Sequence, residues 1–413
     1  MFAHNQPVLP QSAVPHWLAL VSLLLCSIVL YAFRTLQPDV TTCLPALVAA
    51  VALPHMLQQM PKIWVRVKTG NRFSLQRIGV KLLGLTALFS VVLLAYLVFR
   101  GFTQDYLQPL LHMPHGLIVG LLFATPIYIV LTDRVMDEPE DALARLGRNV
   151  LGRAGIETDR QLQQFLLGWL VKGFFGPLMI VFATNDLHDV FAKDISATLA
   201  QQGGWYELGY QFIYFFDVIF AATGYLCTFK LFDAHIRSAE PTLFGWLVCI
   251  ACYPPFWNVL TQNFFAYDHG QSWGDWLQQS PVLYTLWGIA ITACIVIYVW
   301  ATISFGMRFS NLTHRGIITS GPYRFIKHPA YVSKNLSWWL ISVPFIPAGD
   351  VWQSLLDCLA LAMVNGIYFL RAVTEERHLG RDPVYLAYGA WLAEHGLVAR
   401  VRRLIKPLMS TSK

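Results

Sequence analysis

Long apolar runs separated by short polar segments dominate this chain. A transmembrane helix needs about 20 mostly apolar residues, and runs near that length fall at 16–33, 43–58, 77–99, 114–132, 163–184, 209–231, 243–260, 282–304, 331–347 and 351–371. The pattern predicts an all-α, polytopic membrane protein with about ten transmembrane helices. Three runs, 43–58, 243–260 and 331–347, are short or interrupted by proline, so we expect these helices to be tilted, kinked or re-entrant.

Residues 133–162 form the one long polar connection, which mixes acidic side chains with arginines. We expect a cytosolic linker that carries one amphipathic helix. The linker separates a four-helix N-terminal membrane module, residues 1–132, from six further helices. We divide these into middle membrane helices over 163–280 and a C-terminal module over 281–413, and the sequence shows no internal repeat.

Composition excludes a soluble protein. Hydrophobic residues make up 55% of the 413 residues and charged residues only 13%, and the mean hydropathy is +0.48. Lys and Arg gather in alternate loops and in the tail, at Lys62, Arg66, Lys68, Arg72 and Arg77, at Arg308, Arg315, Arg324 and Lys327, and at Arg400, Arg402, Arg403 and Lys406. The positive-inside rule then places both termini on the cytoplasmic side. The net charge of +6 therefore concerns orientation in the lipid bilayer rather than binding of nucleic acid.

The seven cysteines indicate neither disulfides nor a metal site. Six of them lie in apolar runs, and Cys249 and Cys252 have no His or further Cys nearby in the sequence to complete a zinc site. The sequence also lacks a phosphate-binding glycine loop and a Ser-His-Asp arrangement. We expect no bound metal, and the sequence does not indicate an oligomeric state.

Two polar stretches flank the last two apolar runs. The first, residues 315–331, ends in His328-Pro329, where His328 can cap a helix and Pro329 suits its first position. Because the start of a helix carries unpaired N–H groups, it can hold a carboxylate or phosphate. The second stretch, residues 371–379, continues a helix out of the membrane and places Arg371 and Glu375 on one face.

Together these stretches resemble the isoprenylcysteine carboxyl methyltransferase and phospholipid methyltransferase superfamily. The resemblance rests on Gly321-Pro322-Tyr323, His328-Pro329-Ala330-Tyr331 and Glu375-Glu376-Arg-His-Leu379, and covers about the last third of the chain. It implies an integral-membrane enzyme that binds S-adenosylmethionine at the cytoplasmic face and transfers its methyl group to a lipid-like or prenyl-cysteine-like acceptor. The implied cofactor residues are Arg315, Gly316, Ile317, Ile318, Tyr323, His328, Pro329, Ala330, Tyr331 and Glu375.

The resemblance also makes Arg371 an anchor for the acceptor, since a guanidinium can orient a carboxylate or phosphate. A carboxylate acceptor would need no general base. An amine would need a proton acceptor, for which Glu376 or a tyrosine such as Tyr331 is a candidate. We therefore expect Arg371, Glu376 and Tyr331 at the reaction centre.

The sequence departs from the family pattern at the positions where the resemblance implies the acceptor site or a lid over the cofactor. Ser333 replaces a glycine, and a shorter segment beginning at Asp382 replaces a tyrosine-rich one. Lys334 and Asn335 stand one turn into an apolar run, where polar side chains are functional candidates. We expect both to face the acceptor, whose identity the departures leave open.

Two alternatives differ in chemistry. A sterol-reductase-like enzyme would bind NADPH. Such proteins have a segment similar to Arg-His-x-Asn-Tyr-x-Gly-Asp at the position where this chain has His328-Pro-Ala-Tyr331, and this difference argues against a reductase. A transporter or lipid-handling protein would use the intramembrane Asp217 and Lys172, and would favour an internal repeat.

Overall fold

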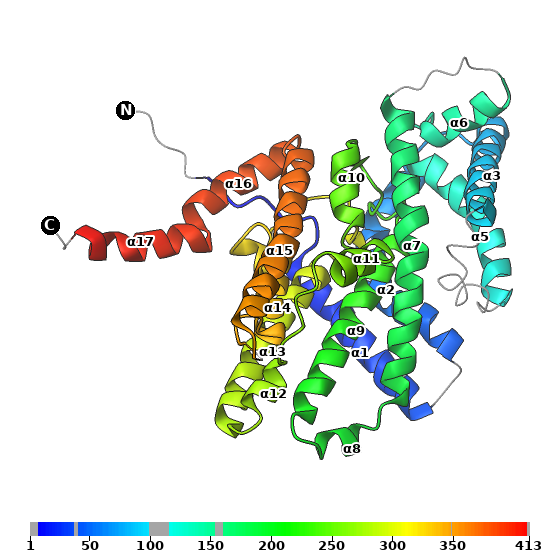
Figure 1. The fold of residues 1–413 in the computed structure, drawn as a ribbon. Coiled ribbons are helices and arrows are strands. Elements are labelled where there is room, and N and C mark those ends of the chain that lie inside the picture. Colours follow the sequence, from blue (N-terminus) through cyan, green and yellow to red (C-terminus); the bar gives the residue numbers. More distant parts are fainter. Residues whose placement is uncertain (1–6, 37–39, 99–114, 153–159, 348, 411–413) are drawn as a thin grey trace.

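The structure is a computed structural model that describes residues 7–36, 40–98, 115–152, 160–347 and 349–410. Helices make up almost all of its regular structure (Figure 1). Over these residues the one sheet is a two-residue antiparallel pair, β1 (Ser238–Ala239) with β2 (Thr313–His314). The prediction of an all-α protein is confirmed.

Six of the described helices are long and apolar enough to cross a membrane, which supports a helical membrane protein. They are α1 (His16–Leu36), α2 (Val40–Thr69), α3 (Leu75–Val98), α7 (Arg160–Ala192), α13 (Pro281–Ile303) and α15 (Val351–Leu379). Two more helices of comparable length, α5 (His115–Val135) and α9 (Gly204–Leu226), occupy other predicted runs. The count of ten spans stays a prediction.

Two predicted runs differ from a continuous spanning helix. The run 243–260 divides into α10 (Leu243–Ile250) and α11 (Phe256–Asn263). The break falls at Pro254-Pro255, because a proline has no N–H for the helical hydrogen bond and clashes with the preceding turn. The run 331–347 yields α14 (Pro329–Ser342), whose 14 residues span roughly 21 Å, less than a hydrocarbon core of about 30 Å.

The core lies where α1, α2, α7, α9 and α13 pack together. Helix α9 contacts α7 on one side and α13 on the other, and α13 also packs against α14. Phe175, Phe215 and Ile291 are fully buried between them. By contrast, α3 exposes Phe89, Leu93 and Leu97, as expected for a face that meets lipid.

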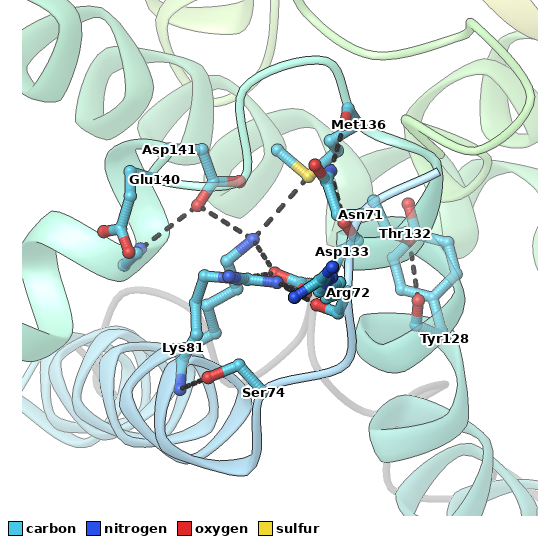
Figure 2. Close-up of polar contacts among 12 residues, drawn as sticks. Asn71, Arg72, Ser74, Lys81, Tyr128, Thr132, Asp133, Met136, Glu140 and Asp141 are labelled. Carbon is cyan, nitrogen blue, oxygen red and sulfur yellow. Dashed lines mark hydrogen bonds and ion pairs between the residues drawn. The ribbon is translucent and has the colours of Figure 1, made fainter. Parts of the chain in front are cut away.

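The connection after α5 contains the expected amphipathic helix, α6 (Ala142–Val150), which packs against α3. Figure 2 shows the polar network that fixes it. The buried Lys81 ammonium lies 2.9 Å from Asp133 Oδ1 and 3.5 Å from Asp141 Oδ1, and Asp141 caps α6. Arg77 donates to both oxygens of Asp133. Because both Lys81 and Asp133 are buried, this network ties α6 to the membrane helices.

Short elements lie at the two ends of the bundle. In Figure 1, α8 (Ile195–Leu199) and α12 (Trp273–Leu277) lie at one end, and α6 and α16 (Pro383–His395) at the other. Beside α16 the chain forms the 3-10 helices η1 (Gly306–Arg308) and η2 (Gly321–Arg324) and the terminal α17 (Leu397–Ser410). The loops predicted to be cytoplasmic thus gather around one end of the molecule.

Candidate functional site

Two adjoining cavities bring the two polar stretches together. The larger, here the inner cavity, has a volume of about 310 Å³ and lies among α7, α9, α13, α14 and α15. The smaller, here the loop cavity, has about 60 Å³ and lies between residues 315–318 and α16. Tyr323, His328 and Glu375 line both. Residues separated by about fifty positions in the sequence therefore border the same two cavities.

Glycine permits the sharp path of the 315–323 segment. Gly316 has φ +109°, and a Cβ there would lie 2.7 Å from the Cβ of Ala13. Gly321 has φ +61°, and its Cβ would lie 2.5 Å from Ser304 Oγ. Both conformations are strained for residues with a side chain. The backbone of this segment therefore lies close to its neighbours, and any side chain at either position would displace it.

The N-terminal segment supports the same loop. Ala13 N donates to Ile317 O at 2.9 Å, and Thr319 Oγ1 donates to Pro10 O at 2.8 Å. Ser12 Oγ accepts from Thr319 N at 3.2 Å. These bonds join the N-terminal segment to a loop 309 residues further along the chain, a contact that neither the apolar pattern nor a motif indicates.

The Arg315 side chain is structural. It is 2% exposed, and its guanidinium donates to backbone carbonyls of Gly224, Cys227, Ala234, Met307 and Phe309. Burial and the nearby charge of Arg308 lower the pKa of Arg315 to about 9, so it remains charged near neutral pH. Only the backbone of this residue is free to contact a ligand in the loop cavity, which it lines.

Glu376 lies outside both cavities. Its carboxylate accepts from Lys327 Nζ at 2.8 Å and pairs with His328 Nε2 at 3.0 Å. His328 stands at the N-cap position of α14, but its side chain does not cap the helix. Its ring instead stacks on Tyr331, with centroids 5.5 Å apart. The sequence placed Glu376 at the reaction centre, whereas in the structure its contacts with Lys327 and His328 hold it outside both cavities.

Arg371 and Glu375 both face the inner cavity from α15. Glu375 Oε2 accepts a 2.8 Å hydrogen bond from Tyr331 Oη. Arg371 is 8% exposed, donates to Asn311 Oδ1 and lies 5.2 Å from the Tyr331 ring centroid. Its guanidinium makes no ion pair within the described ranges. A buried guanidinium with few partners is suited to hold an anion.

Lys334 faces the same cavity from α14, whereas Asn335 does not line it. The Lys334 ammonium lies 5.0 Å from the ring centroid of Tyr298 and 5.9 Å from that of Tyr368. The two positions differ because successive helical residues point about 100° apart. Asn335 keeps a buried Oδ1 that lacks a hydrogen-bond partner among the described residues.

Most predicted site residues border one of the two cavities. The exceptions are Pro329, Asn335 and Glu376: Pro329 is buried at the first position of α14 and lines neither cavity.

Burial raises the pKa of Tyr323 well above its ordinary value, and that of Tyr388 also rises. Both side chains therefore remain neutral phenols that can donate hydrogen bonds.

The structure adds lining residues that the sequence did not single out. These are the tyrosines at 214, 253, 298 and 368 and the polar residues Glu240, Asn311 and His378. Helical spacing could have predicted two of them: Tyr368 and His378 fall three and seven residues from Arg371, on the same face of the helix. No sequence pattern indicated Asn311, because only the fold brings it to Arg371.

Comparison with known proteins adds no assignment, since the chain matches no protein-family model, no curated protein and no solved structure.

Proposed function

We propose that this protein is an integral-membrane methyltransferase that transfers the methyl group of S-adenosylmethionine to a lipid-like acceptor. One observation carries the proposal: the stretches 315–331 and 371–375, which share the family resemblance, border the same pair of cavities. The proposal includes cytoplasmic placement of this recess, which follows from the distribution of Lys and Arg.

The lining residues suit the cofactor. A volume of about 310 Å³ falls at the lower end of the usual range for ligand sites, roughly 300–1,000 Å³. Backbone groups of 316–318, the Tyr323 and His328 side chains and the Glu375 carboxylate would hold it. When bound, the cofactor supplies a methyl group on a sulfonium, which is a good leaving group. Glu375 offers the negative charge that such a cation needs.

The chain's own contribution is orientation and exclusion of water. Arg371 and Lys334 carry positive charge into the inner cavity and would position an anionic group of the acceptor. Tyr331 donates to Glu375 and lies beside Arg371, so it fixes both relative to one another. Glu376 holds His328 in place from outside and is a positioning residue in this scheme.

Binding of S-adenosylmethionine to the detergent-purified protein, measured by calorimetry with NADPH in parallel, tests the proposal. We expect micromolar binding, at least tenfold weaker in His328→Ala and Glu375→Gln. Glu394→Gln, an exposed glutamate on α16, is the matched control and should bind as the unmodified protein does. Lack of binding by a folded sample would refute the proposal, and binding of NADPH instead would favour a reductase. A labelled-methyl screen of lipid extracts would then identify the acceptor.

A further inference from the structure

The last helix, α17, leaves the bundle sideways. In Figure 1 it runs across the direction of α7 and α15 and extends away from both. Its start is fixed beside the bundle, because Leu397 N donates to Phe325 O at 2.8 Å and the Arg400 guanidinium lies 5.7 Å from the Phe325 ring centroid. Helix α17 therefore begins among the cation-rich loops, and its main packing partner is α16.

One face of α17 is an exposed apolar stripe. Its members recur at spacings of three and four residues, which places them on the same side of a helix. Their relative exposure lies between 44% and 73%. The stripe consists of Leu397, Val398, Val401, Leu404 and Ile405. Because a row of large apolar side chains open to water is unfavourable, it marks an interaction surface.

The opposite face of α17 is basic. It carries Arg400, Arg402, Arg403 and Lys406, and the helix contains no Asp or Glu. At about 100° per residue, the bases centre on the side of the helix away from the stripe. All four are exposed, and none forms an ion pair with a side chain that the structure describes. Four positive charges therefore remain available to an anionic partner.

Charge and direction together identify the partner as a lipid surface. An apolar stripe opposed by Lys and Arg is typical of helices that lie in the membrane interface. The spanning helices α7 and α15 follow the membrane normal, so a helix that runs across them lies along the membrane plane (Figure 1). Anionic lipids of the cytoplasmic leaflet attract bases at this depth. A second copy of the chain would cover the stripe but leave the basic face without counter-charges.

We propose that α17 lies in the membrane interface, with its apolar stripe among the acyl chains and its bases at the head groups of anionic lipids. This contact does not depend on the proposed methyl transfer. Helix α17 continues from α16, whose Tyr385 and Tyr388 line the loop cavity. Lipid bound to α17 therefore also restrains one wall of that cavity.

An environment-sensitive fluorescent probe on introduced cysteines tests the proposal in full-length protein reconstituted into vesicles. Leu404→Cys places the probe in the stripe, and Lys406→Cys places it on the basic face. The native cysteines are buried or half-buried, so the unmodified protein gives the background. The vesicles are phosphatidylcholine with or without phosphatidylserine, and they include lipids with a doxyl quencher near the head group. We expect these lipids to quench the Leu404→Cys probe and to leave the Lys406→Cys probe unquenched.

A double replacement in the Leu404→Cys protein tests the role of charge. Arg402→Gln with Lys406→Gln removes two bases that have no hydrogen bond or ion pair with the described residues. In vesicles with phosphatidylserine it should lower the ratio of membrane-bound to free α17 roughly thirtyfold, which is measured as loss of quenching. Arg377→Gln with Arg381→Gln removes the same charge from exposed positions outside α17 and should retain the quenching.

Equal quenching of the two probes, or no quenching at Leu404→Cys, would overturn the proposal. A blue-shifted probe at Leu404→Cys that doxyl lipids do not quench would mean that protein, such as a second copy, covers the stripe. Quenching that is the same with and without phosphatidylserine, or in the double variant and its control, would also overturn it. Thermal unfolding of each variant checks that it is folded.

Discussion

At the scale of single residues, Arg315 shows how one side chain can join several loops. Its planar guanidinium reaches carbonyls from the end of α9, from the loop that follows it and from residues 307–309. Lysine has a single ammonium and cannot satisfy so many acceptors at once. We therefore expect Arg315→Lys to leave buried carbonyls unpaired and to lower the free energy of unfolding by roughly 3 kcal/mol.

Thermal unfolding in detergent measures this effect. Arg324→Lys is the matched control, because Arg324 is exposed and its replacement should leave the Tm nearly unchanged. An Arg315→Lys protein as stable as this control would contradict the structural role assigned to the guanidinium.

A second single residue, His235, makes the free energy of unfolding depend on pH. Burial and the charge of Lys230 lower the pKa of His235 to about 4, from an ordinary value of 6.5. Between these values the unfolded chain binds more protons than the folded chain. The contribution of His235 to the free energy of unfolding is therefore fully favourable above pH 6.5 and is lost as the pH falls towards 4.

We expect the Tm to fall less steeply between pH 7 and pH 5 in His235→Gln than in the unmodified protein. His188→Gln, which replaces an exposed histidine on α7, controls for loss of a histidine elsewhere. Parallel Tm curves for His235→Gln and the unmodified protein would show that the folded state does not suppress protonation of His235.

At the scale of elements, the network in Figure 2 decides how α6 is held. Lys81 and Asp133 have side chains only 3% exposed, so removing Asp133 leaves the buried Lys81 ammonium with only its longer, 3.5 Å contact to Asp141. We expect Asp133→Asn to destabilise the protein by roughly 3 kcal/mol. Asp137→Asn, an exposed acid of the same connection, should have little effect.

A double replacement separates charge from packing in this network. Lys81→Met with Asp133→Leu removes both charges, so we expect it to be more stable than Asp133→Asn alone. Thermal unfolding of the three proteins checks this order. A double variant that is the least stable of the three would mean that the ion pair itself, rather than the avoidance of an unpaired charge, stabilises α6.

At the scale of the whole molecule, the two ends of the bundle differ in charge. The cation-rich loops and α16 lie at one end, and α8 and α12 at the other (Figure 1). We expect cysteines introduced at Asp268 and at Arg402 to react with a membrane-impermeant maleimide from opposite sides of a vesicle. All seven native cysteines are buried or half-buried, so the unmodified protein provides the background. Labelling of both positions from one side would refute the predicted orientation.

Local sequence determined much of this architecture. Apolar run length predicted the membrane helices, because a lipid core demands a helix of fixed length. The Pro329 signal fixed the start of α14, and four-residue spacing placed Arg371 and Glu375 on one face of α15. These features depend only on the geometry of one helix, which sequence spacing contains.

Only the tertiary structure decided what each face meets. It divided 243–260 at Pro254-Pro255, although proline lies inside several continuous helices of this protein. It turned Glu375 to the cavity and Glu376 to Lys327, a choice between adjacent carboxylates that depends on distant partners. It also brought Asn311 to Arg371 and the N-terminal segment to residues 317–319. Such contacts join residues far apart in the chain, and their geometry arises only when the helices pack.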